Sequence, residues 1–419
     1  MKVFVEPNKN FTEEIKYVFR TLAHANGIPV EFVADAADSQ ISAGSSTGFS
    51  FNVSESFYTE IGVKNFRHDQ HLKKDCIIRN DNGDPDYLST IFYMINSLQE
   101  YDDAETDEIG RFKYTNSYQH KFGNVEDNLV GQYSQKIFGQ SQNTKSRIFL
   151  SHDIDSINGA VLQDSLFLLK KGNPLPVFKL VMNAALQRPD WLNMDKIMRI
   201  ESEYSLKSTF FWLVNKGRLN KREVNSDYSI NNPKVRALQN TIETIGWENG
   251  LHKSISSDSY KEELASLALP AIANRNHYLK FRLPDLYNDI EASGLQMDAS
   301  LGFAEAVGFR NSFGLPFHPF NLKERKPHSF VEVPLTVMDG TLKQYRGVPL
   351  EETAPQIISF LEKNKTGCVI SVLWHNTFFT EYKFGGYVKV YKQILEYIHA
   401  NGLRSINPRE IVKEFAWQK

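Results

Sequence analysis

The feature that most constrains the fold is a regular alternation of short apolar segments and longer amphipathic segments after residue 146 of this 419-residue chain. The short segments predict strands at Arg147–Ser151, Ser208–Val214, Trp247–Leu251, Ile272–Arg275, Gln296–Asp298, Phe330–Pro334 and Val369–Trp374. The longer segments predict helices at Leu192–Tyr204, Lys234–Ile245, Ser259–Leu269, Leu286–Ser293, Pro355–Lys363 and Tyr387–Asn401. Such alternation favours a parallel β/α architecture, in which reactive residues collect at the C-terminal ends of the strands.

The first 145 residues follow a different pattern. Lys2–Val5 and Val30–Val33 are typical of short strands, and Thr12–Ala25 has helical spacing that stops at Asn26-Gly27. Tyr87–Leu98 also predicts a helix. We therefore predict an α/β protein of two domains: a small N-terminal α/β domain at residues 1–145, with no catalytic constellation, and an irregular (β/α) barrel at residues 146–419.

Composition excludes several classes of function. The formal net charge is −2, with 48 Lys and Arg against 50 Asp and Glu, so bulk electrostatics predicts no nucleic-acid partner. Cys76 and Cys368 form no CxxC pattern, which argues against a disulfide framework or a thiolate metal site. No apolar run approaches the roughly 18 residues of a membrane span, and Met1–Pro7 does not read as a signal peptide. A cytoplasmic location is expected.

Two carboxylates stand where the first strand of the second region ends. Arg147–Leu150 runs directly into Ser151-His152-Asp153-Ile154-Asp155. Alternate residues of a strand share a face, so Asp153 and Asp155 are expected to point the same way. Two like charges repel, and a cation beside them is one resolution. The other interpretation is a loop whose aspartates cap the next helix.

Further polar residues follow other predicted strands. His252 ends one strand, Arg275 and His277 end another, and His375 ends the last. A single histidine is more often structural, but the coincidence of these positions favours a common site. Carboxylate and imidazole ligands suit Zn²⁺, with Co²⁺ or another divalent ion as alternatives.

These segments, in this order, resemble the NodB-type polysaccharide deacetylases, also called carbohydrate esterase family four, and in particular a bacterial subgroup with an N-terminal extension. The resemblance spans about residues 146–415 and rests on Asp153-Ile154-Asp155, Ser208-Thr209-Phe210-Phe211, Gly250-Leu251-His252, Arg275-Asn276-His277-Tyr278 and Leu373-Trp374-His375. It implies that Asp153 is the general base, Asp155 and His252 are metal ligands, Arg275 orients the catalytic aspartate and His375 is the general acid.

The chain departs from the family where a second metal histidine is expected, four residues after His252. Ser256 stands there, and serine is a poor ligand by comparison. His277 is the candidate replacement; alternatively a water fills the place, or the metal binds weakly or not at all. Arg282-Leu283-Pro284 could carry the arginine motif instead, but Arg275 leaves room for a full helix before Gly294.

Three further residues are candidates for substrate contact. A backbone N–H near Tyr278 could stabilise an oxyanion. Asp298 could hold His375 as an imidazolium, and Arg310 could meet an anionic sugar, although a structural salt bridge is an equal interpretation for Arg310.

The resemblance implies a metal-dependent hydrolase that removes N-acetyl, or O-acetyl, groups from a sugar or glycan precursor. The expected partners are a glycan substrate and enzymes of a surface-glycan pathway. Two alternatives stay open: an amidase acting on a non-sugar C–N bond, and a non-catalytic carbohydrate-binding barrel with a degenerate metal site.

Overall fold

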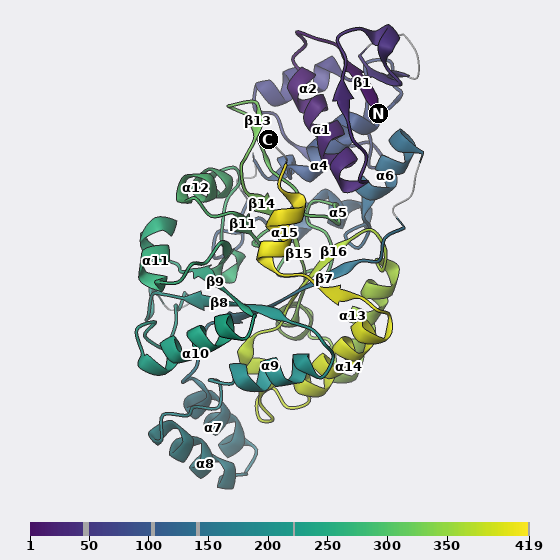
Figure 1. Cartoon of the computed structure of the whole chain (residues 1–419). Coiled ribbons are helices and arrows are strands. Elements are labelled where there is room, and N and C mark those ends of the chain that lie inside the picture. Colours follow the sequence, from purple (N-terminus) through teal and green to yellow (C-terminus); the bar gives the residue numbers. More distant parts are fainter. Residues whose placement is uncertain (45–49, 102–104, 140–142, 221–222, 418–419) are drawn as a thin grey trace.

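A curled sheet of nine strands forms the centre of the computed structural model, which describes residues 1–44, 50–101, 105–139, 143–220 and 223–417. Its strand order is β14–β11–β10–β9–β8–β7–β16–β15, with β17 also paired to β7, and all these pairings are parallel. The order starts at β14 and ends at β15, which are consecutive in the chain. The sheet therefore curls into an irregular, nearly closed barrel with helices around it (Figure 1), and the predicted fold class is confirmed.

The strands of this sheet are β7 (Arg147–Ile154), β8 (Ser208–Leu213), β9 (Glu248–Lys253), β10 (Ala273–Asn276), β11 (Met297–Asp298), β14 (Val331–Glu332), β15 (Leu335–Met338), β16 (Val369–Leu373) and β17 (Arg404–Ser405). The helices are α7 (Ala160–Lys170), α8 (Leu175–Ala185), α9 (Met194–Ser202), α10 (Pro233–Thr244), α11 (Tyr260–Leu267), α12 (Asp285–Ser293), α13 (Leu350–Lys363), α14 (Tyr387–Ala400) and α15 (Pro408–Phe415). A small hairpin joins β12 (Phe320–Asn321) to β13 (Lys326–Pro327).

All seven predicted strands and all six predicted helices of this region are confirmed within a few residues. The central strands are recognisable because both faces are covered, so β8 and β16 are buried at every position. The sequence interpretation missed β15, whose start directly after Pro334 concealed it. It also missed β17, α15 and the helix pair α7–α8.

A glycine in β9 gives one local reason for the geometry of the sheet. A Cβ on Gly250 would lie 2.5 Å from the ring of Phe211 on β8, so the two strands can pair at this register only without a side chain there. The ring of Phe211 in turn lies 4.7 Å from the guanidinium of Arg275. Gly250 therefore helps to place a charged side chain of the site described below.

The N-terminal region forms a second, four-stranded parallel sheet of order β2–β1–β3–β4. Its strands are β1 (Lys2–Val5), β2 (Glu31–Phe32), β3 (Ile41–Ala43) and β4 (Ser50–Phe51), and β5 (Ile78–Arg79) pairs with β6 (Pro85–Asp86). Its helices are α1 (Thr12–Ala25), α2 (Glu55–Gly62), α3 (His68–His71), α4 (Tyr87–Ile95), α5 (Tyr118–Phe122) and α6 (Leu129–Phe138). The predicted strands and helices of this region occur, and the strand at Val30–Val33 is shorter than predicted.

The two regions pack against each other over a continuous hydrophobic core that includes residues on both sides of position 145. The hydroxyl of Tyr17 on α1 donates to the carbonyl of His318 at 2.8 Å, and Phe309 N–H donates to the carbonyl of Val125 at 2.7 Å. The boundary at residues 145/146 stays a prediction. In the part of the chain that is described, no helix is long and apolar enough to cross a membrane.

Candidate active site

The site is built around the C-terminal end of β7, where Asp153 and Asp155 lie. Arg275 on β10 is fully buried and donates from Nη1 to Asp153 Oδ1 at 2.9 Å and to Ser151 Oγ at 2.8 Å. Its Nε donates to the carbonyl of Ala299 at 3.0 Å. These contacts fix the orientation of the Asp153 carboxylate, which is 4 % exposed. The fold therefore brings together Arg275 and Asp153, as expected from the sequence. Arg282 is not needed to orient the Asp153 carboxylate.

Three potential metal ligands lie beside this carboxylate: Asp155 directly after β7, His252 on β9 and His277 directly after β10. One ligand atom from each lies within 4.8 Å of the others. Asp155 Oδ1 is 3.3 Å from His252 Nε2 and 3.7 Å from His277 Nε2. Asp155 Oδ1 is also buried without a hydrogen-bond partner. Because an unpartnered buried oxygen is costly, the donor set fits a cation.

Burial and neighbouring charges shift the pKa values of all three groups. His252 Nδ1–H donates to the carbonyl of Arg275 at 2.8 Å, so Nε2 is the ring nitrogen directed at Asp155. Burial acts to lower the pKa of His252, but the charges of Asp153 and Asp155 outweigh it and raise that pKa. Burial lowers the pKa of His277 to about 4, so this ring is neutral. Burial acts to raise the pKa of Asp155, but the nearby His277, His252 and His375 outweigh it and lower that pKa below its usual range.

Ser256 stands where the resemblance leads us to expect a second metal histidine. The Ser256 hydroxyl donates to Glu263 at 2.9 Å and accepts from Asn215 at 3.1 Å, so it is held by structural partners. His277 follows the neighbouring strand β10 and places its ring 5.0 Å from that of His252, centroid to centroid. The trio is thus assembled at the C-terminal ends of β7, β9 and β10, and β8 lies between the first two of these strands.

His375 follows β16 on the other side of β7 and is held by Asp339, which follows β15. His375 Nδ1–H donates to Asp339 Oδ1 at 2.7 Å, and the His375 backbone N–H donates to Asp339 Oδ2 at 2.6 Å. His375 Nε2 faces Asp155 Oδ2 at 3.7 Å. Burial acts to lower the pKa of His375, but the charge and hydrogen bond of Asp339 outweigh it and raise that pKa to about 10. The ring is therefore a protonated acid at neutral pH.

A cavity of about 170 Å³ joins these groups. Its lining includes both aspartates, His252, His277 and His375, together with Tyr278, Tyr345 and Phe378. Arg111 from the N-terminal region also lines it, donating from Nη1 to the carbonyl of Tyr278 at 2.9 Å and to the hydroxyl of Tyr345 at 3.2 Å. The sequence interpretation missed Asp339 and Arg111, and the N-terminal region does contribute a residue to the site.

Two of the proposed substrate contacts lie away from this cavity. Asp298 is fully buried and accepts hydrogen bonds from Asn274 and Ser300, so Asp339 holds His375 in its place. Arg310 is 2 % exposed and pairs through Nε and Nη2 with Glu100 at 2.8 and 2.6 Å. Tyr278 does reach the cavity, where its ring stacks on His277 with centroids 4.0 Å apart.

The structural role of Arg310 gives a testable result. Arg310→Met should destabilise the protein by about 3–5 kcal/mol, because it leaves Glu100 buried without its partner. The midpoint of urea unfolding measures this, and the double variant Arg310→Met/Glu100→Gln should recover part of the loss. A variant of unchanged stability with a raised KM would instead return Arg310 to the substrate-binding role.

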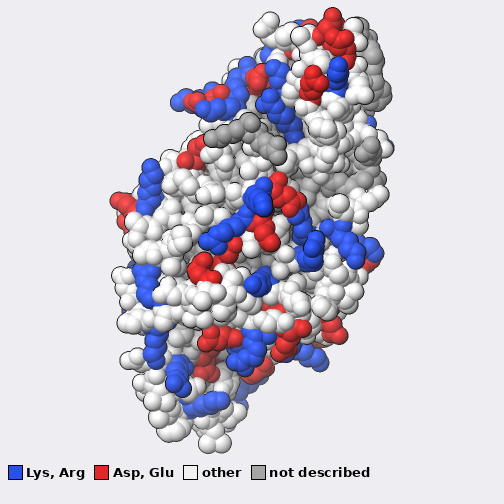
Figure 2. Space-filling model, viewed as in Figure 1, with Lys and Arg blue, Asp and Glu red and all other residues white. Residues whose placement is uncertain are grey.

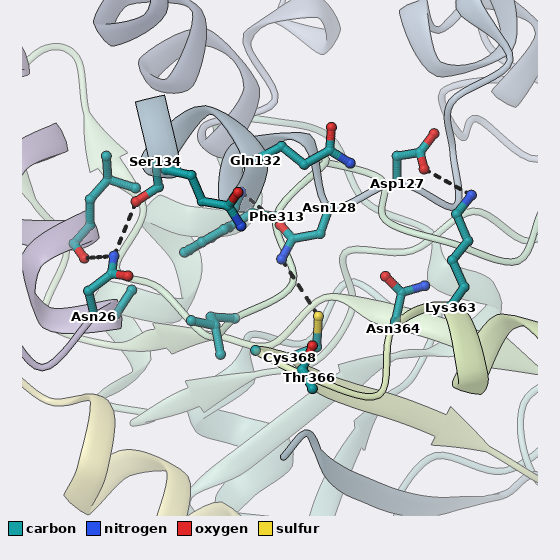
Figure 3. Close-up of a pocket in the computed structure, with 16 residues that line it drawn as sticks. Asn26, Asp127, Asn128, Gln132, Ser134, Phe313, Lys363, Asn364, Thr366 and Cys368 are labelled. Atoms are coloured by element: carbon teal, nitrogen blue, oxygen red, sulfur yellow. Dashed lines mark hydrogen bonds and ion pairs between the residues drawn. The ribbon is translucent and has the colours of Figure 1, made fainter. Parts of the chain in front are cut away.

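A second cavity, of about 210 Å³, lies between the N-terminal region and the start of β16 (Figure 3). Asn128 crosses it to Cys368 Sγ at 3.6 Å, while its Oδ1 accepts from the backbone N–H groups of Gly131 and Gly314. Lys363 pairs with Asp127 at 2.9 Å at its edge. The polar side chains labelled in Figure 3 lie between the two regions, near the N-terminal end of β16. The candidate active site lies at the opposite, C-terminal ends of the strands.

The chain matches one family model and is distantly similar to several solved structures. A model described as a family of unknown function (DUF7033) matches residues 3–144. No curated protein matches the chain. A candidate polysaccharide deacetylase from Mycobacterium smegmatis is 12 % identical with a TM-score of 0.41, over 67 % of this chain and 96 % of its own length.

Two further solved structures are similar to the chain at a comparable level. A 4-alpha-glucanotransferase from Thermococcus litoralis is 12 % identical with a TM-score of 0.38, over 64 % of this chain and 38 % of its own. A pseudoenzyme of the CE4 family from Bacillus anthracis is 13 % identical with a TM-score of 0.33, over 66 % and 68 %. Likeness at this level transfers no activity, so the function has to come from the site.

Proposed function

We propose that this protein is a metal-dependent hydrolase that removes N-acetyl, or O-acetyl, groups from a sugar or glycan precursor. One observation carries the proposal: Asp153 and His375 line the same cavity, and each is held in place by a hydrogen bond to a charged partner. The partner of Asp153 is Arg275, and the partner of His375 is Asp339. A binding module needs no such base and acid pair. We also propose that the protein belongs to the bacterial deacetylase subgroup with an N-terminal extension, and that it acts in the cytoplasm.

In this mechanism Asp153 accepts a proton from the attacking water, and His375 donates a proton to the departing nitrogen. Arg275 keeps the Asp153 carboxylate aimed at the cavity, and Asp339 keeps His375 protonated and aimed across it. The backbone beside Tyr278 lies at the cavity wall, where an N–H can stabilise the oxyanion. Asp155, His252 and His277 would hold a divalent ion, for which Zn²⁺ is the preferred candidate. When bound, such an ion supplies Lewis-acid polarisation of the acyl carbonyl.

The size and lining of the cavity limit the substrate. A space of about 170 Å³ holds an acetyl group and part of one sugar ring, with the rest of a glycan outside. Tyr345 and Phe378 in its wall offer aromatic faces that can pack on the C–H side of a sugar. Arg111 adds a hydrogen-bond donor from the N-terminal region, so that region takes part in substrate binding. Enzymes of a surface-glycan pathway are the partners that this proposal implies.

Acetate release tests the proposal directly. Purified protein loaded with Zn²⁺ or Co²⁺ should release acetate from some member of a panel of N-acetylated and O-acetylated oligosaccharides, and a chelator should stop the reaction. Hydrolysis of cyclic ureides in place of acetylated sugars would favour the amidase alternative. Absence of turnover on either panel, with sugar binding retained, would favour the non-catalytic barrel.

Asp339 is a positioning residue whose removal has a distinct signature. Asp339→Asn removes the charge that raises the pKa of His375, so that pKa should fall by about one unit or more. A general acid acts only while protonated, so activity is lost as pH rises through its pKa. The alkaline limb of the pH–rate profile should therefore move to lower pH in Asp339→Asn. An unmoved limb with uniformly lower activity would show that Asp339 is only structural.

A further inference from the structure

The helices α7 and α8 form a hairpin that projects from the barrel at the end opposite to the N-terminal region (Figure 1). Its surface is unusually apolar. Of the thirteen large hydrophobic side chains that are exposed among the described residues, eight lie on this hairpin: Leu162, Leu166, Leu169, Leu175, Phe178, Val181, Met182 and Leu186. Leu175 and Phe178 are 84 % and 72 % exposed. So large an apolar surface on one element marks an interaction site.

The exposed side chains form a stripe on each helix. On α7 they recur at helical spacing from Leu162 to Leu169, and on α8 from Leu175 to Leu186. Leu168 and Leu180 are buried, so each helix also has an apolar side chain turned inward. The outer stripes therefore exceed what the hairpin needs for its own packing.

The charges of the hairpin are mostly positive. Lys170, Lys171, Lys179 and Arg188 are exposed, and Figure 2 shows blue side chains among uncharged surface at this end of the molecule. The acidic Asp164 is buried and accepts from the backbone N–H of Lys383. The hairpin thus pairs exposed apolar side chains with a basic surface, which complements an anionic one.

We propose that the α7–α8 hairpin docks on an anionic lipid bilayer. Each helix has eleven residues, about 16 Å, against the roughly 20 residues of a span, so the hairpin would lie in the interface with Leu and Phe among the acyl chains. Its lysines and arginine would meet lipid phosphates. A protein partner or a second copy explains an apolar face but does not require the positive charge.

The hairpin is connected to the candidate active site at both ends. Asp155 precedes the start of α7 by five residues, and Asn376, the neighbour of His375, donates to the carbonyls of Ser156 before α7 and Trp191 after α8 at 2.8 and 2.7 Å. Docking would therefore hold the cavity close to the bilayer. If the proposed function holds, the substrate would be a glycan carried at the membrane surface; the docking itself does not depend on that function.

Co-sedimentation of the full chain with vesicles tests the docking. The protein should sediment with vesicles of phosphatidylcholine mixed with phosphatidylglycerol, and much less with phosphatidylcholine alone. Leu175→Asp/Phe178→Asp should abolish this binding, whereas the matched double variant Val63→Asp/Leu219→Asp, at exposed sites elsewhere, should bind like the wild type. Circular dichroism of each variant verifies that the fold is retained.

A charge series separates the electrostatic contribution. Substituting Gln for Lys170, Lys171 and Lys179 should weaken binding to the anionic vesicles about tenfold or more, while Gln at the exposed Lys261, Lys323 and Lys413 should not. Absence of binding by the wild type, or equal binding by the Leu175→Asp/Phe178→Asp variant, would overturn the proposal. So would a wild-type dimer that this variant makes monomeric, because a second copy would then cover the hairpin.

Discussion

Asp153→Asn should lower the rate of acetate release by at least about a hundredfold, because an amide cannot accept the proton of the attacking water. The side chain keeps its shape, and an amide oxygen can still accept from Arg275 Nη1, which now lies 2.9 Å from Asp153 Oδ1. The fold and the trio of Asp155, His252 and His277 should therefore be unchanged. Steady-state kinetics, with metal content and thermal midpoint measured on the same preparation, isolates the chemical effect.

Asp298→Asn is the matched control for this substitution. Asp298 is also a buried aspartate at the end of a barrel strand, but it faces Asn274 and Ser300 and does not line the cavity. This variant should keep most of the activity per folded protein. Wild-type turnover by Asp153→Asn would rule out the base assignment, and a loss in Asp298→Asn equal to that in Asp153→Asn would return Asp298 to the site.

Much of the barrel could be predicted because its central strands are covered on both faces. β7, β8, β9 and β16 consist of continuous or nearly continuous buried segments. Conspicuous polar residues stand at or just after the ends of β7, β9 and β16. Parallel pairing then brings those ends to one edge of the sheet. This is why Asp153, Asp155, His252 and His375 could be grouped before their distances were known.

The missed residues depend on information that local sequence does not carry. Asp339 follows β15, a short strand hidden directly after Pro334, so no separate strand end was expected there. Arg111 reaches the cavity from the N-terminal region through its contact with the carbonyl of Tyr278, and only the packing of the two regions places it. For Arg310 the sequence left two roles open, contact with an anionic sugar or a structural salt bridge. Its partner Glu100 lies some two hundred positions earlier, so only the folded chain reveals the ion pair.

Metal analysis of His277→Ala has the largest expected effect on the site itself. The wild type should bind about one divalent ion per chain after incubation with Zn²⁺. Removing one ligand of the trio leaves Asp155 and His252 alone, so metal affinity should fall by about a hundredfold or more. Elemental analysis after dialysis, and titration with Zn²⁺ and Co²⁺, measure this without reference to any substrate. Ser256→Ala is the control, because Ser256 bonds to Asn215 and Glu263.

The two outcomes separate the remaining interpretations of the site. Loss of metal in His277→Ala, with metal retained in Ser256→Ala, would mean that a histidine from the strand next to His252 replaces the ligand that the related motif draws from the same segment as His252. The unpartnered Oδ1 of Asp155 and the neutral His277 ring favour this result. A wild type that takes up neither Zn²⁺ nor Co²⁺ would leave Asp155 without a cation, and the carbohydrate-binding barrel would then be the better account of the protein.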